Sequence, residues 1–152
     1  MELLAKQAVR PGRGWIALAL ALAVLIQAGP VCGVDLSIVE TVTLDFGAVL
    51  DDDGAVVLGL ADAITADPAG IHVGSAVFTG QYTISGDPFA AFSLSVAGSS
   101  ASGLTIDTFV TSEGDAEQGR DLQMGATLTV DSASASPGLD QTLSYTITVD
   151  YN

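Results

Sequence analysis

The last twelve residues, from Gln141 to Asn152, constrain the fold more than any other stretch of the chain. Polar residues alternate there with a set of large apolar ones: Leu143, Tyr145, Ile147, Val149 and Tyr151. A period of two places successive side chains on opposite faces of an extended chain, and β-branched and aromatic residues favour strands. We predict a half-buried strand. Because its central residues include no charge, Gly or Pro, this is the most aggregation-prone window of the chain, and we expect it to pair within its own domain.

Shorter candidate strands precede this one, and most of them alternate in the same way, while residues 55–60 form a short apolar run. They span residues 34–46, 55–60, 73–85, 89–97, 104–111 and 122–130, with turn-forming Gly, Pro, Asp and Ser between them. Frequent turn signals without helical periodicity are typical of an all-β sandwich. We therefore predict one Ig-like, pilin-like antiparallel β-sandwich of about seven to nine strands over residues 34–152.

The first predicted strand covers residues 34–46. Its apolar residues share one parity: Leu36, Ile38, Val42, Leu44 and Phe46. Glu40 interrupts this set, and a charge on the buried parity indicates a strand end, a bulge or an edge. An acidic turn of three aspartates followed by Gly54 comes next and predicts a hairpin.

Residues 1–33 have a different composition from the rest of the chain. Lys6, Arg10 and Arg13 precede a run of twelve apolar residues from Trp15 to Ile26, and small and turn-forming residues follow it. A basic start, an apolar run of this length and a small-residue exit predict a helical signal peptide, cleaved after Gly33 or Ala28. The run is shorter than the roughly 20 residues of a membrane span. We expect export to the periplasm, cell surface or medium, with only transient membrane contact.

The leader also contains Cys32, which is the only cysteine of the chain. No internal disulfide can form, so the fold depends on its core. A lipid anchor on Cys32 is the second choice. A lipoprotein would need a small residue directly before the cysteine and an aliphatic residue three positions before it, whereas Gly29, Pro30 and Val31 precede Cys32. Removal of the leader leaves Arg120 as the single basic residue against 17 acidic ones, a net charge of −16. This charge excludes nucleic acid as a partner.

Residues suited to catalysis are scarce. His72 is the only histidine, no cysteine is available to pair with it, and no phosphate-binding or zinc-binding motif occurs. We therefore expect neither an enzyme nor a cofactor. Asp51, Asp52 and Asp53 form the one cluster suited to a hard cation such as calcium. The spacing of an EF-hand is absent, so a solvated turn is the preferred interpretation and the three aspartates remain weak calcium candidates.

Four segments together carry a family resemblance. Thr43–Gly47 (TLDFG), Phe78–Ile84 (FTGQYTI), Met124–Val130 (MGATLTV) and the closing Tyr145–Asn152 (YTITVDYN) resemble the bacterial "domain of unknown function 4402" family. The resemblance covers essentially all of residues 34–152. It implies a secreted, Ig-like, pilin-like domain.

Two functions from different classes follow. The first is a structural or adhesive subunit of a surface fibre that assembles by β-strand addition, in which backbone bonds give affinity and alternating side chains give register. Residues 34–46 would then be the donor strand, and the last strand would face a periplasmic chaperone. Its partners would be other copies or other fibre subunits. The alternative is a monomeric secreted module that binds a glycan or calcium.

Overall fold

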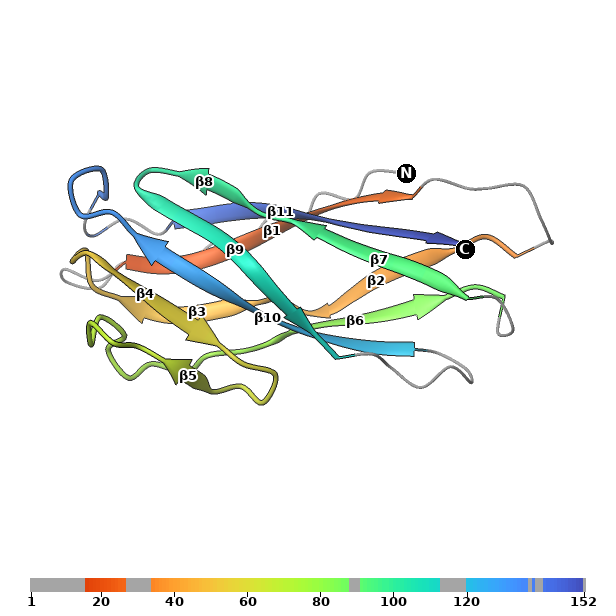
Figure 1. Ribbon diagram of the computed structural model, residues 1–152, viewed down its shortest axis with the longest axis horizontal. Helices are drawn as coiled ribbons and strands as arrows, with labels where there is room; N and C mark the ends of the chain where they lie inside the picture. The colour runs from red at the N-terminus through yellow and green to blue at the C-terminus, as the bar shows by residue number, and fades with distance from the viewer. Residues whose placement is uncertain are drawn as a thin grey trace.

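A computed structural model describes residues 16–26, 34–87, 91–112, 120–136, 138 and 141–151. These residues form an elongated all-β domain (Figure 1), which confirms the predicted fold class. The strands are β1 (Ile16–Ile26), β2 (Ser37–Val42), β3 (Asp45–Val49), β4 (Gly54–Leu58), β5 (Ile64–Ala66), β6 (Gly80–Ser85), β7 (Phe92–Ala97), β8 (Ser99–Ala101), β9 (Leu104–Thr111), β10 (Arg120–Val130) and β11 (Gln141–Tyr151). Within the described ranges there is no helix, and so none that could cross a membrane.

The strands form two sheets. One sheet has the order β3-β1-β11-β7. The other has the order β2-β6-β10-β4-β5, with β9 paired to β10 and β8 to β9. All strand pairs are antiparallel except β1 with β11. Ten of these strands lie within residues 34–152, against the seven to nine predicted there, and two of the ten, β5 and β8, have only three residues each. The remaining strand, β1, comes from the predicted leader.

Strand β10 organises the larger sheet. One of its edges pairs with β6 as far as Met124 and with β4 from Ala126 onward, while β9 pairs along the other edge. Gly125 stands where the partner changes. A Cβ atom there would collide with the carbonyl oxygen of Leu58, so the close approach of β4 requires glycine at this position.

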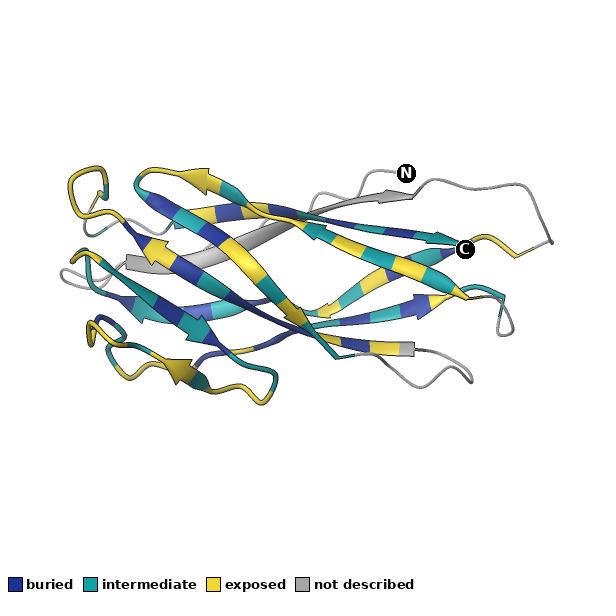
Figure 2. Ribbon diagram, viewed as in Figure 1, coloured by how far each residue is buried: buried dark blue, intermediate teal, exposed yellow. Residues whose placement is uncertain are grey.

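The core lies between the two sheets. Alternate residues of β10 and β11 are buried (Figure 2), as the sequence pattern predicts: Leu122, Met124, Ala126, Leu128, Val130, Leu143, Tyr145, Ile147 and Val149. Tyr145 of one sheet packs against Phe109 of the other, with ring centroids 5.7 Å apart and a tilt of 46°. Tilted aromatic pairs of this kind stabilise a packed interior beyond the area they bury.

The helix predicted for the leader is wrong over residues 16–26, which form β1. An apolar run of this length is compatible with either structure by composition, and pairing with two neighbouring strands decides between them. The predicted cleavage positions after Ala28 and Gly33 lie outside the described residues.

The strand predicted over residues 34–46 is also wrong in one respect, because the structure divides it. β2 belongs to the larger sheet and β3 to the smaller one, and the chain crosses between them at Thr43 and Leu44. The pairing register of β2 shifts next to Glu40, so the irregularity expected at this charge is confirmed. The turn at residues 51–53 likewise connects the two sheets instead of forming a hairpin, since β3 and β4 pair with different strands.

Candidate strand-binding slot

Strand β11 is a central strand of the smaller sheet because β1 covers one of its edges. The two strands are parallel, and their register runs from Leu18 opposite Gln141 to Ile26 opposite Val149. β7 covers the other edge in antiparallel pairing from Thr146 onward. Nearly the whole length of β11 on the first side is therefore paired by one segment, which the sequence assigns to the leader.

Strand β3 is the second neighbour of β1. The pair is antiparallel, with Ile16 opposite Val49 and Ala17 opposite Ala48. The other edge of β3 is bonded to residues 71–78: the Asp45 and Phe78 backbones exchange hydrogen bonds of 2.8 and 2.9 Å. Removal of β1 would therefore leave one edge of β3 without a strand partner and the other edge still paired. We call the space between β3 and β11, which β1 fills, the β3–β11 slot.

The residues of β11 beside the slot are among the most buried of the protein. Leu143, Tyr145, Ile147 and Val149 are each at most 2% exposed. In register they stand opposite Leu20, Leu22, Val24 and Ile26 of β1. The exposed Ser144 stands opposite Ala21.

The sequence of β1 contains a signal that the sequence analysis missed. Residues 16–24 alternate strictly between bulky apolar residues and alanine, in the order Ile-Ala-Leu-Ala-Leu-Ala-Leu-Ala-Val. A run that is apolar at every position is normally assigned to a helix or a strand by its length. Alternation between large and small side chains within such a run is easily overlooked. The same period of two that predicts β11 is therefore present in β1.

A small polar cluster lies in the interior beneath β11. The hydroxyl groups of Tyr145 and Tyr82 are hydrogen-bonded to each other, which connects the two sheets. The hydroxyl groups of Tyr82 and Thr43 face the Glu40 carboxylate and lower its pKa, while its buried Oε1 atom has no hydrogen-bond partner among the described residues. Burial raises the pKa of Glu40 and of both phenols, so all three groups favour their neutral forms in this environment.

The predicted interaction residues divide into two sets. Those of the last strand lie in β11 beside the slot, with Tyr151 half-buried at its end. Those of the first predicted strand are built into the domain: Leu36, Ile38, Leu44 and Phe46 are buried and Val42 is half-buried. β2 pairs with β6, and β3 lies in the other sheet. Residues 34–46 are thus already used within their own domain.

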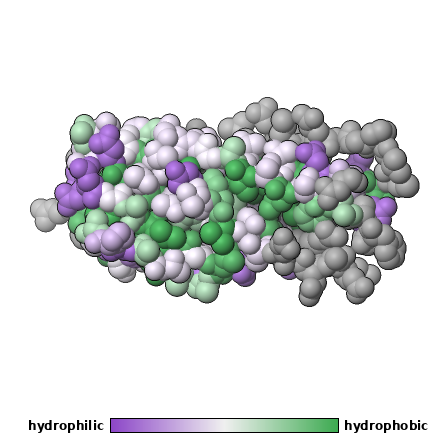
Figure 3. All heavy atoms as spheres, viewed as in Figure 1, coloured by the Kyte–Doolittle hydropathy of each residue, from purple (hydrophilic) through white to green (hydrophobic). Residues whose placement is uncertain are grey.

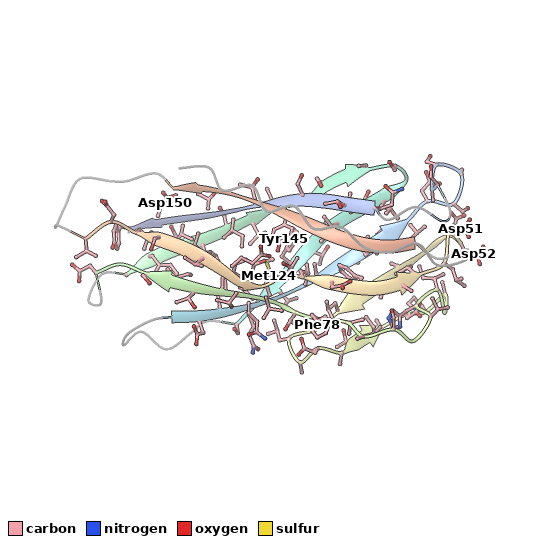
Figure 4. The ribbon with its side chains drawn as sticks, turned by 180° about the vertical axis from the view of Figure 1, so that it is seen from behind. Asp51, Asp52, Phe78, Met124, Tyr145 and Asp150 are labelled. Carbon is pink, nitrogen blue, oxygen red and sulfur yellow. The ribbon has the colours of Figure 1, made fainter. Side chains whose placement is uncertain are left out.

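The three aspartates of the acidic turn do not come together as a metal site. Asp52 and Asp53 are exposed and Asp51 is half-buried, at the end of the domain away from Asp150 (Figure 4). The Asp53 carboxylate accepts a hydrogen bond of 2.7 Å from the Ser132 backbone, which lowers its pKa. No group of three metal-ligating side chains occurs within the described ranges.

Other candidate features of the described residues lie apart from one another in the sequence. His72 is half-buried beside β3, where its backbone forms a bridge with Val49. Apolar and neutral residues share the face seen in Figure 3, and hydrophilic ones gather toward one end. The large apolar side chains that the described residues expose are Val34, Val39, Phe78 and Val110. They come from separate parts of the chain, and single exposed residues of this kind are ordinary.

The fold and the slot together define a β-sandwich in which one strand of the smaller sheet comes from the predicted leader. Comparison with known proteins found no match to this chain among family models, curated proteins or solved structures. Its resemblance to the "domain of unknown function 4402" family stays a prediction.

Proposed function

We propose that the chain is an exported, non-catalytic structural or adhesive subunit that assembles by accepting a β-strand into the β3–β11 slot. One observation carries the proposal: the strand between β3 and β11 is a segment of the predicted leader. Cleavage after Ala28 or Gly33 would remove residues 16–26 from the chain. Two neighbouring strands would then each have an unpaired backbone edge, which is a template for a strand from another molecule.

The burial of β11 supports this proposal. Four large side chains of β11 are buried beside the slot, from Leu143 to Val149. Burial of one such side chain contributes about 1.5–3 kcal/mol, so the four contribute on the order of 10 kcal/mol as an upper bound. Part of this burial is against the facing sheet, where Tyr145 packs against Phe109. An empty slot would lose the remaining part, and a replacement strand would restore it.

The pairing of residues 34–46 supports a different donor strand from the one expected. Residues 34–46 are paired inside their own domain, so donating them would disrupt β2 and β3. The donated strand must come from elsewhere, either another part of a second copy or another fibre subunit. A periplasmic chaperone would fill the same slot during export. β11 keeps the expected role of the strand that faces a chaperone. In the mature subunit its edge would accept a strand from another molecule, which replaces the expectation that β11 pairs only within its own domain.

The test compares two exported forms of the chain. The first is the natural chain, purified after its leader has been removed; the second is a form in which a blocked cleavage site retains residues 16–26. We expect the cleaved form to give oligomers or fibres by light scattering and electron microscopy, in proportion to concentration. The uncleaved form should remain monomeric. A cleaved form that is a stable monomer at high concentration, without fibres, would refute the proposal.

A further inference from the structure

The leader segment has the properties of a specific ligand of the slot. Its register with β11 covers every residue from Gln141 to Val149 without a break. Its bulky residues stand opposite buried residues of β11, and Ala21 stands opposite the exposed Ser144. Since a shift of one residue would reverse this match along the whole strand, the alternation fixes which residues of β1 share a face with the buried residues of β11.

We infer that residues 16–26 close the β3–β11 slot in cis, so that the chain cannot accept a strand from another molecule until cleavage of the link makes this segment exchangeable. The identity of what fills the slot afterwards rests on the proposed function; closure in cis does not. A tethered segment has an effective concentration in the millimolar range, so it competes well against any separate strand. Cleavage removes this advantage.

The chain path allows release without damage to the domain. Ile26 is in register with Val149, near the end of β11. The Val34 carbonyl oxygen accepts a hydrogen bond from the hydroxyl group of Tyr151, which lies at the same end. Both predicted cleavage positions fall between Ile26 and Val34. A cut there separates β1 from the domain and leaves β2 anchored.

The slot also defines the chemistry of its partner. An incoming strand must run parallel to β11 and antiparallel to β3, as β1 does. It needs bulky apolar residues at alternate positions, in register with Leu143, Tyr145, Ile147 and Val149. The backbone bonds are common to any strand, so this pattern supplies the selectivity.

The experiment uses the full chain with residues 27–33 replaced by a seven-residue protease site. After cleavage we expect the leader fragment to stay bound to the domain in gel filtration, since its pairing does not depend on the covalent link. A labelled peptide of residues 16–26, made soluble by terminal lysines, should then exchange with it. A peptide of the same composition with its leucines placed consecutively should not. Immediate loss of the fragment without a change in melting temperature would overturn the inference, as would equal exchange by both peptides.

Two matched substitutions in the cleavable chain test the register. Leu22→Asp places a charge opposite the buried Tyr145, and Ala21→Asp places the same charge opposite the exposed Ser144. We expect the fragment to dissociate about tenfold faster or more in the first variant, and little change in the second. Equal rates would contradict closure by this register. A domain that releases the fragment but never assembles would refute the proposed function and leave closure in cis intact.

Discussion

The hydroxyl group of Tyr151, at the end of β11, donates a hydrogen bond of 3.2 Å to the carbonyl oxygen of Val34. The same hydroxyl oxygen accepts a 2.7 Å hydrogen bond from the Asp87 backbone. One side chain thus joins the last strand, the start of the predicted mature domain and the connection that follows β6. Tyr151 thus holds Val34, the residue that follows the predicted cleavage region, against the end of β11.

Replacement of this residue tests the fastening. Tyr151→Phe keeps the ring and removes both hydrogen bonds, each of which contributes about 0.5–1.5 kcal/mol. We expect a loss of about 1–3 kcal/mol in the free energy of unfolding, measured in urea. Asp35→Asn, at an exposed neighbouring position, is the control and should leave the midpoint unchanged. If Tyr151→Phe unfolds at the same midpoint as the natural protein, the two hydrogen bonds of the Tyr151 hydroxyl group do not stabilise the fold.

The two interior tyrosines should behave as a coupled pair. Tyr82→Phe or Tyr145→Phe each leaves the other hydroxyl group with one partner fewer in a buried site, at a cost of about 1–3 kcal/mol. The double variant should cost less than the sum, because neither unpaired group remains. A double-mutant cycle of unfolding free energies measures the difference. Strict additivity would show that the hydrogen bond between Tyr82 and Tyr145 contributes nothing.

Glu40 predicts how stability depends on pH. Burial raises its pKa in the folded protein, and hydrogen bonds from Thr43 and Tyr82 oppose this in part. The folded state therefore binds the proton more tightly than the unfolded chain, in which the pKa is about 4.3. The stabilising contribution is complete below that pH and is lost as the pH rises through the folded pKa. Tyr82 and Tyr145, which face the carboxylate, stay neutral throughout because their pKa values are raised further.

Glu40→Gln should remove this dependence. The variant should be more stable than the natural protein at neutral pH and similar to it near pH 4, as measured by melting temperature. Asp45 also has a pKa raised by burial, so a smaller slope of the same sign should remain in the variant. A variant that is less stable than the natural protein at pH 7 would mean that the charged form of Glu40 is favoured in the fold.

Ile147 tests the placement of β11. Its side chain is fully buried, so Ile147→Asp forces a carboxylate into the core and should cost more than about 4 kcal/mol. We expect no soluble folded protein. Ser144→Asp makes a similar change on the exposed face of the same strand and should shift stability by less than about 0.5 kcal/mol. Soluble Ile147→Asp protein with natural stability would contradict the buried position.

The sequence was sufficient for features that depend on local alternation. β9, β10 and β11 lie where a period of two predicts them, β4 lies where a short apolar run predicts it, and the buried parity of β10 and β11 is correct. The sequence was insufficient where the pairing partner of a segment decides which sheet the segment joins. Residues 34–46 alternate almost continuously, yet they divide between two sheets because β2 pairs with β6 and β3 with β1. No local pattern distinguishes a long strand from one that changes sheets.

The slot itself could be predicted only in part. The alternation of β11 predicts a strand that must be covered, and the composition of residues 1–33 predicts that residues 16–26 belong to a leader. Their pairing depends on a match of register between segments more than a hundred residues apart. The alternation of bulky residues and alanine in β1 was visible, but its meaning required the position of β11. The site arises from the match between the two segments.

The most direct test is amide hydrogen exchange of β11, compared between the uncleaved chain and the chain without its leader. In the uncleaved chain, amides of β11 that face β1 should be protected between Thr142 and Val149, and those on the other edge should be protected from Thr146 onward, where β7 covers it. Without the leader, every second amide, on the edge that faces β3, should exchange at least about tenfold faster, because it has lost its strand partner. Addition of the peptide of residues 16–26 should restore the protection. Equal protection of β11 in both forms would contradict the claim that the leader segment fills an open place in the sheet.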